Sequence, residues 1–147
     1  MPESSKWEGP NFKMRVVGRV FSLAIYLSRF SHPHFDFDFV LVVLYSNGLW
    51  KCVGQLPNAH LATIYSIDYA PAKAGHGRLV SAGADNRIQI YREAMGSTSD
   101  KPLFSLETCI ETAHGDVNCV CWHPWDGSIL CSAGDDGAVR LWRFESC

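Results

Sequence analysis

The sequence lacks what marks a membrane-spanning or nucleic-acid-binding protein. Its longest uncharged apolar run, Phe39 to Tyr45, is far shorter than the roughly 20 residues that span a bilayer. The net charge of −2 and a pI near 6.3 provide no broad basic surface for nucleic acid or an acidic membrane. Charged residues make up only 19% of the chain and aromatic residues as much as 12%, which argues against disorder. We therefore expect a folded protein with no transmembrane helix, no nucleic-acid partner and no membrane partner.

The six cysteines also lack the spacing of a metal site or a disulfide framework. No C-x-x-C pair occurs, and the spacings do not resemble those of a zinc ribbon. Cys119 and Cys121 stand two apart in an apolar run, as small buried residues of a strand do. This pattern predicts reduced thiols in a cytosolic or nuclear protein. The apolar stretch from Met14 to Leu27 is interrupted by Arg19 and has no small-residue cleavage pattern after it, so we do not interpret it as a secretory signal.

What the sequence does contain is an internal repeat in its C-terminal two thirds. A stretch that begins at His60 matches one that begins at His114, and Ser-Ala-Gly followed by an Asp turn recurs at Asp85 and Asp136. The two His residues are 54 positions apart and the two Asp residues 51, so the register is kept within three residues. Each unit reads as a strand, a loop, a strand ending in Ser-Ala-Gly, a tight turn and a strand ending in an aromatic residue. This is the pattern of a WD-repeat β-propeller blade of about 40 to 45 residues.

The repeat predicts an all-β chain holding part of a WD-repeat β-propeller: two blades and one strand of a normally seven-bladed ring. Seven blades of about 40 residues need roughly 280 residues, whereas this chain has 147. We expect the last strand of one blade at 49–56, a blade at 57–106 and the final blade at 107–147. Residues 1–48 form an atypical leader, either mispredicted or disordered, although Phe35 to Phe39 alternates like a half-buried strand.

The repeated polar positions predict a buried hydrogen-bond network in each blade. The Asp before the third strand can accept hydrogen bonds from its own turn and from the His that starts the blade, and buried polar groups require such partners. We expect the first network to use His60, Ser66, Asp85 and Tyr91, with Tyr in place of the usual Trp. We expect the second to use His114, Asp136 and Trp142, with Cys119 where a hydroxyl belongs.

Two clusters invite an interpretation as chemistry. His, Ser and Asp together resemble a hydrolase triad, but the same spacing recurs in both repeats, and no G-x-S-x-G elbow or P-loop accompanies it. His32 and His34, followed by Asp36 and Asp38, have no spaced partner set that completes a metal site. We interpret that segment as a solvated turn leading into a strand. The sequence thus predicts no catalytic residue, no metal site and no cofactor.

Several strings in the C-terminal two thirds resemble one subfamily of WD-repeat proteins. The most discriminating are Trp50-Lys51-Cys52-Val53, Thr63-Ile64-Tyr65 and Ala113-His114-Gly115-Asp116-Val117-Asn118. They look like the late blades of the WD-repeat subunit of the cytosolic iron–sulfur protein assembly targeting complex. The resemblance covers about Leu49 to Cys147.

The resemblance implies a non-catalytic scaffold, without a cofactor, that helps deliver iron–sulfur clusters to cytosolic and nuclear apoproteins. It implies as partners the other proteins of the targeting complex and client apoproteins, and a cytoplasmic and also nuclear location. It further implies that an N-terminal segment supplies the outer strand of the final blade, for which Arg19 to Leu27 is the candidate. We expect partner contacts on the face of the Asp turns, at Tyr65, Asn118 and Asp135. A generic WD-repeat interaction adaptor and a truncated, non-functional fragment remain the alternatives.

Overall fold

The computed structural model describes residues 16–17, 22–32, 35–46, 49–70, 77–98 and 101–144. Its strands are β1 (Val16–Val17), β2 (Ser22–His32), β3 (Phe35–Ser46), β4 (Leu49–His60), β5 (Ile64–Ala70), β6 (Arg78–Gly83), β7 (Arg87–Glu93), β8 (Phe104–Glu111), β9 (Val117–Trp122), β10 (Ile129–Gly134) and β11 (Val139–Arg143). No helix in this part of the chain is long and apolar enough to cross a membrane. The prediction of an all-β chain is confirmed.

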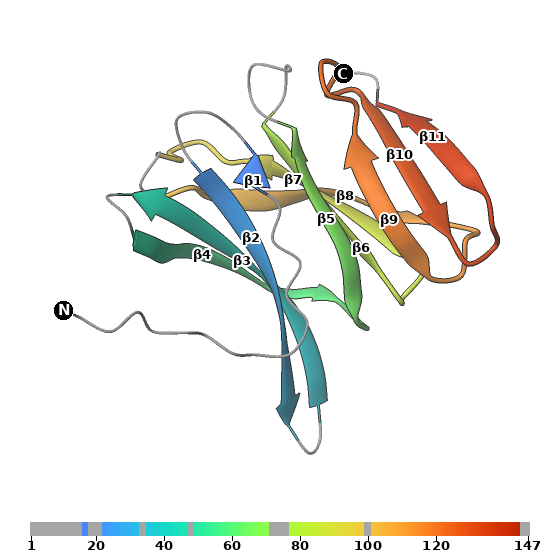
Figure 1. Ribbon diagram of the computed structural model, residues 1–147, viewed down its shortest axis with the longest axis horizontal. Helices are drawn as coiled ribbons and strands as arrows, with labels where there is room; N and C mark the ends of the chain where they lie inside the picture. The colour runs from blue at the N-terminus through green and yellow to red at the C-terminus, as the bar shows by residue number, and fades with distance from the viewer. Residues whose placement is uncertain are drawn as a thin grey trace.

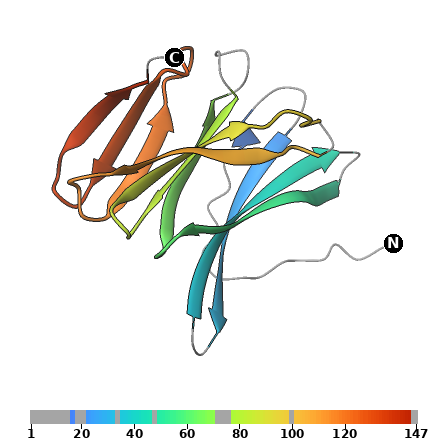
Figure 2. The same ribbon diagram turned by 180° about the vertical axis from the view of Figure 1, so that it is seen from behind.

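The strands form three antiparallel sheets that follow one another along the chain. Their orders are β1-β2-β3-β4, β5-β6-β7-β8 and β11-β10-β9, so neighbours in the sequence are neighbours in each sheet. Figures 1 and 2 show the sheet β5–β8 in the middle, with β1–β4 on one side of it and β9–β11 on the other. Consecutive meander sheets arranged side by side are the architecture of a β-propeller segment.

The first sheet includes part of the leader. β4 pairs with β3 over most of its length and runs to His60, four residues beyond the strand expected at 49–56. β2, which overlaps the segment proposed to complete the final blade, pairs instead with β3 and β1. That expectation for Arg19 to Leu27 is corrected here, because β2 and β3 form a continuous antiparallel hairpin. The transition expected at Asn47–Gly48 lies outside the described residues.

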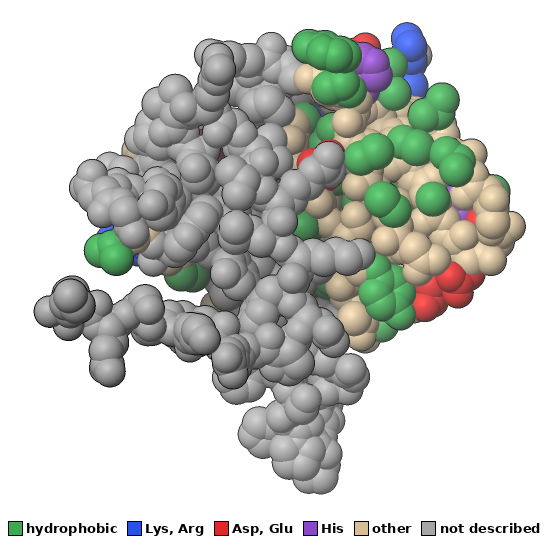
Figure 3. Space-filling model, in the orientation of Figure 1, with side chains coloured by type: hydrophobic (Ala, Val, Ile, Leu, Met, Phe, Trp, Pro, Cys, Tyr) green, Lys and Arg blue, Asp and Glu red, His purple; other side chains and the backbone are tan. Residues whose placement is uncertain are grey.

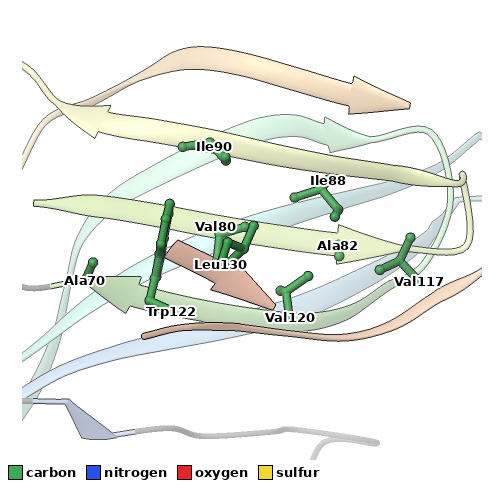
Figure 4. Close-up of a cluster of buried hydrophobic side chains, with 9 residues drawn as sticks. All are labelled: Ala70, Val80, Ala82, Ile88, Ile90, Val117, Val120, Trp122 and Leu130. Carbon is green, nitrogen blue, oxygen red and sulfur yellow. The ribbon is translucent and has the colours of Figure 1, made fainter. Parts of the chain in front are cut away.

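A hydrophobic core joins the second and third sheets. The middle sheet contributes apolar side chains from β5, β6 and β7, and the last sheet contributes them from β9 and β10; they are Ala70, Val80, Ala82, Ile88, Ile90, Val117, Val120, Trp122 and Leu130. Figure 4 shows these side chains gathered between the two groups of strands. Burying one such branched side chain stabilises the fold by about 1.5–3 kcal/mol. This core fixes how the two repeats sit against each other.

The other face of the middle sheet has its own core. Ile64, Ile67, Leu79 and Tyr91 pack there with Ala59 at the end of β4. Since both faces of the middle sheet are covered, all six residues of β6, Arg-Leu-Val-Ser-Ala-Gly, are buried. Fully buried strands carry no polar/apolar alternation, so the period-2 signal is weakest at the centre of the structure.

The glycine that ends each Ser-Ala-Gly string allows two backbones to approach closely. A Cβ atom on Gly83 would lie 2.2 Å from the Thr63 carbonyl oxygen, and one on Gly134 would lie 2.4 Å from that of Asp116. No side chain fits at either position without moving the loop that precedes β5 or β9. The glycine of the repeated string therefore lets the loop before the first strand of each sheet pack directly against the end of the second strand.

Candidate functional site

The first His–Asp–Ser network ties the entry of the middle sheet to its second strand and first hairpin turn. His60 Nδ1 donates to Asp85 Oδ1 over 2.8 Å, and the Ser81 hydroxyl bonds His60 Nε2 over 2.8 Å. Asp85 also accepts the backbone N–H groups of Leu61 and Arg87, at 3.0 and 3.2 Å. A single carboxylate thus holds the chain before β5 and the β6–β7 turn at the same time.

The second network repeats this geometry in the last sheet. His114 Nδ1 lies 2.7 Å from Asp136 Oδ1, and His114 Nε2 lies 2.8 Å from the Ser132 hydroxyl. Trp142 Nε1 donates to that hydroxyl over 2.8 Å. Arg140 is an addition, since its guanidinium lies 2.6 Å from Asp136 Oδ2 and also contacts the ring of His114.

The hydroxyl of the first network comes from a different strand than the sequence analysis expected. Ser66 takes no part in it, and the hydroxyl belongs to Ser81 on β6. In the second repeat the equivalent hydroxyl is that of Ser132 on β10. The expectation that Cys119 replaces this hydroxyl is therefore wrong, because the network has its hydroxyl on another strand. Both serines belong to the Ser-Ala-Gly string, and the recurrence of that string was the signal that pointed to them.

Tyr91 lies next to the first network but bonds differently from Trp142. Its hydroxyl donates to Gln89 Oε1 over 2.7 Å. Burial raises the pKa of Tyr91 to about 12, although the nearby Ser81 hydroxyl acts in the opposite direction. The phenol therefore stays protonated at neutral pH and extends the network as a neutral group.

The two carboxylates at the centre of the networks remain ionised. The hydrogen bond from His114, with the Arg140 guanidinium and the Ala138 N–H in support, holds the pKa of Asp136 well below its usual value. Burial pushes the pKa of Asp85 upward, but the hydrogen bonds from His60 and two backbone N–H groups outweigh it and lower the pKa. A permanently charged acceptor keeps each His ring in one orientation.

These networks are closed to substrates. Ser81 is 0% exposed and Ser132 is 1% exposed, so neither hydroxyl can reach a molecule in solution. No group of three or more His, Cys, Asp or Glu side chains is placed to hold a metal ion in the part of the chain that the structure describes. The side chains of His32, His34, Asp36 and Asp38 lie outside that part. The described networks can organise loops, but they offer no reactive group.

The residues predicted to contact partners meet at the loops these networks hold. The Tyr65 hydroxyl donates to Asp116 Oδ2 over 3.2 Å, and Asn118 Nδ2 donates to Asp135 Oδ1 over 2.6 Å. We call Tyr65, Asp116, Asn118 and Asp135 the polar rim. Asp116 was missed by the sequence analysis, although it stands in the Ala-His-Gly-Asp-Val-Asn string. The rim spans both repeats, because Tyr65 is the second residue of β5 and Asn118 the second residue of β9, while Asp116 directly precedes β9 and Asp135 directly follows β10.

A second polar contact between the repeats was also missed. The Ser66 hydroxyl bonds both backbone groups of Val120, accepting its N–H at 3.1 Å and donating to its carbonyl at 3.3 Å. Asp68 Oδ2 accepts the N–H of Trp122 over 2.7 Å. We call Ser66 and Asp68 the clamp. It occupies backbone groups of β9 on the edge that β10 does not pair.

A buried arginine supports the opposite end of the same junction. Arg78, only 3% exposed, donates two hydrogen bonds of 2.8 Å to Glu107, and its Nη1 donates to the Gly127 carbonyl over 3.4 Å. Its guanidinium lies 5.8 Å from the ring centre of Phe144, which follows β11. Hydrogen bonds from Arg78 hold the pKa of Glu107 below its usual value, with help from Arg92. The two repeats are therefore tied together at both ends of their strands.

Comparison with known proteins identifies the repeat and its relatives. Residues 106–143 match the family described as WD domain, G-beta repeat. A Nematostella vectensis protein named probable cytosolic iron-sulfur protein assembly protein CIAO1 homolog is 41% identical over 96 residues, or 65% of this chain and 28% of the relative. The Rattus norvegicus CIAO1 is 38% identical over 101 residues, or 68% of this chain and 29% of its own length. The chain thus spans less than a third of these curated relatives.

A solved structure gives the same fold at larger coverage. A chain in the crystal structure of the Chaetomium thermophilum polycomb repressive complex 2 matches 91% of this chain and 26% of its own length, with a TM-score of 0.60. The sequence identity is 12%, so this likeness concerns the fold alone. Residues 106–143 thus match a WD40 repeat, and about two thirds of the chain is similar in sequence to part of the cytosolic iron–sulfur protein assembly proteins named CIAO1.

Proposed function

We propose that this chain is a non-catalytic scaffold of cytosolic iron–sulfur protein assembly. It would hold other proteins of the targeting machinery together with client apoproteins while clusters are delivered, in the cytoplasm and for nuclear clients as well. The observation that carries this proposal is the 34–41% identity to proteins named for that assembly, over about two thirds of the chain.

The geometry supports a binding role. Each network fixes a loop at the start of a sheet, and the loops carry the polar rim on one end of the strands. Three members of the rim, Tyr65, Asn118 and Asp135, are our candidates for partner contact. Asn118 and Asp135 are exposed and Tyr65 is half-buried, and the rim offers carboxylate, amide and phenol groups that can bind a partner's polar groups. Rigid loops lower the entropy lost when a partner binds.

The test is affinity purification of the tagged full chain from a cytosolic extract, with identification of the co-purifying proteins. We expect proteins of iron–sulfur assembly to be enriched. The triple variant Tyr65→Ala, Asn118→Ala and Asp135→Ala should lose most of that enrichment. Trp125→Ala is the matched control, because Trp125 is 82% exposed and sits in the β9–β10 turn at the other end of the strands.

The result separates the alternatives. Enrichment of a different set of proteins, such as ubiquitin-transfer or chromatin subunits, would indicate a generic WD-repeat adaptor. A folded chain that retains no protein would indicate a non-functional fragment. Enrichment that survives in the triple variant would remove the rim from the proposal while leaving the scaffold role in place.

A further inference from the structure

A side-chain bond joins the turn between β6 and β7 to the segment that leads into β9. Thr112 Oγ1 donates to Asn86 Oδ1 over 2.6 Å and also lies 3.2 Å from the Asn86 carbonyl oxygen. The backbone N–H of Thr112 donates to the same carbonyl over 2.9 Å. An exposed ion pair of Arg87 with Glu111 flanks this contact over 3.0 Å, and exposed ion pairs stabilise little. We call Asn86 and Thr112 the link.

The link stands between the two His networks. Asn86 directly follows Asp85, the carboxylate of the first network. The buried Thr112 hydroxyl accepts the backbone N–H of His114, whose ring belongs to the second network, over 3.2 Å. A hydroxyl can donate one hydrogen bond while it accepts another. One side chain therefore connects the two networks.

The backbone of Asn86 indicates that its side chain matters. Among the described residues it is the one non-glycine with a positive φ, 61°. The corresponding turn of the last sheet has Gly137 at this position, with a φ of 71°. Asparagine tolerates the left-handed region, but glycine adopts it more readily. What Asn86 adds, compared with glycine, is the amide oxygen that accepts the Thr112 hydroxyl.

The positions of three members of the polar rim depend on where His114 lies. Asp116 and Asn118 follow it by two and four residues. The Asp116 carbonyl accepts the N–H of Asp135 over 3.1 Å, so this third member is held by the same segment. The fourth member, Tyr65, follows the loop that the first network holds. Figure 3 shows acidic side chains gathered at this end of the last sheet, where β9 begins and β10 ends.

We propose that Asn86 and Thr112 are positioning residues of the polar rim. Their bond fixes the segment 112–118 relative to the turn that holds the loop before β5, so the rim meets a partner as one preformed surface. A preformed surface loses less conformational entropy on binding, and the link therefore raises the affinity without touching the partner. That a partner binds the rim rests on the proposed function, whereas the contacts of the link do not depend on it.

The first experiment needs no partner. It measures amide hydrogen exchange of the full chain by NMR, in the wild type and in Asn86→Gly. Glycine keeps the left-handed turn and removes only the acceptor, so the variant should fold normally. We expect the amides of His114 and Asp135 to exchange about three- to tenfold faster, the factor that one hydrogen bond contributes. The Trp122 amide, bonded to Asp68 at the other end of β9, should not change.

Variants of Thr112 separate positioning from general stability. Thr112→Val removes the hydroxyl and should accelerate the same two amides, whereas Thr112→Ser keeps the hydroxyl and should restore wild-type exchange. The double variant with Asn86→Gly should be no faster than Thr112→Val alone, because the same bond is lost in both. A substitution that acted only by lowering global stability would accelerate the Trp122 amide as well.

The second experiment measures the consequence for binding. The tagged full chain with Asn86→Gly should retain the partners of the wild type but enrich them about three- to tenfold less. Thr98→Val is the matched control, because the Thr98 hydroxyl accepts an N–H in the loop after β7, at the opposite end of that strand. This control should enrich the partners as the wild type does.

Two results would overturn the proposal. One is unchanged exchange of the His114 amide in Asn86→Gly, or an acceleration that extends equally to Trp122. The other is partner enrichment at the wild-type level although the His114 amide exchanges faster, since the link would then not position the rim for binding. A wild-type chain that captures no assembly protein would contradict the proposed function instead, and the exchange of the two amides would still decide whether the link holds the segment 112–118.

Discussion

The middle and last sheets are built from the same repeat, yet they differ in what surrounds them. Both contain a buried His ring held between an ionised Asp and a Ser hydroxyl. Among the described residues, the middle sheet has four strands and a core on both faces, whereas the last sheet has three strands and a core on the face toward the middle sheet. The network is thus a property of one repeat, while the fate of its apolar faces depends on the neighbours. A repeat sequence specifies its interior more strictly than its exterior.

The largest difference should come from two leucines of the last sheet. Leu130→Ala should lower the free energy of unfolding by about 2–5 kcal/mol, because it leaves a cavity in the core between the sheets. Leu141→Ala, on the exposed face of the same sheet, should change it by less than about 0.5 kcal/mol. Urea unfolding at low protein concentration measures both. Equal effects would show that the two faces are not distinct in solution.

The clamp should account for the next largest difference. Asp68→Ala leaves the Trp122 N–H without its acceptor, which should cost about 1–3 kcal/mol. Cys119→Ala, at the position of the last sheet that corresponds to the clamp residue Ser66, should cost less than about 0.5 kcal/mol, because Cys119 is exposed. Thermal unfolding of the two variants tests this. A neutral Asp68→Ala variant would contradict a stabilising clamp.

A smaller contrast is expected between the two aromatic ends of the networks. Trp142→Phe removes the hydrogen bond to Ser132 and should cost about 1 kcal/mol. Tyr91→Phe removes the bond to Gln89; Gln89 is partly exposed, so water can replace the phenol and the cost should be smaller. Chemical denaturation of both variants gives the ranking. A larger loss of stability for Tyr91→Phe than for Trp142→Phe would mean that the Tyr91 hydroxyl stabilises its network more than its single bond to Gln89 indicates.

The smallest contrast lies in the response to acid. The pKa of Asp136 is lowered in the folded chain, so its contribution to stability is present above the unfolded value of about 4 and is lost as the pH falls below it. Asp136→Asn should therefore flatten the decline of stability between about pH 5 and pH 2. Asp85→Asn should flatten it less, because burial opposes the lowering of that pKa. The free energy of unfolding of both variants, measured by urea denaturation across this pH range, tests which substitution flattens the decline more.

The repeat made the fold predictable from the sequence. The His and Asp positions recur at nearly constant spacing, and this regularity identifies the blades even where β6 is buried on both faces and shows no alternation. The same regularity predicted the His, the Asp and the aromatic residue of each network, but it did not predict the serines Ser81 and Ser132. The segment that contains β2 was expected in the final blade and pairs instead with β1 and β3, because its sequence follows no clean period and belongs to no repeat that would fix its place.

The misplaced hydroxyl has a physical cause. Ser66 and Ser81 both stand in strands that follow His60, and spacing alone does not say which strand presents its serine to the His ring. The answer depends on the register of β5 against β6, where Ser81 lies opposite Ile67 and shares its face. The clamp was out of reach for a similar reason, since Asp68 meets a residue 54 positions away in another sheet.

The clamp has a consequence for motion as well as for stability. The amide hydrogens of Val120 and Trp122 are bonded to side chains of β5, so they become free only when the two repeats separate. Their exchange with solvent hydrogen then reports the opening of the junction between the sheets, independently of the unzipping of β9 from β10. We therefore expect these two amides to exchange together, as in a cooperative unit that comprises both repeats.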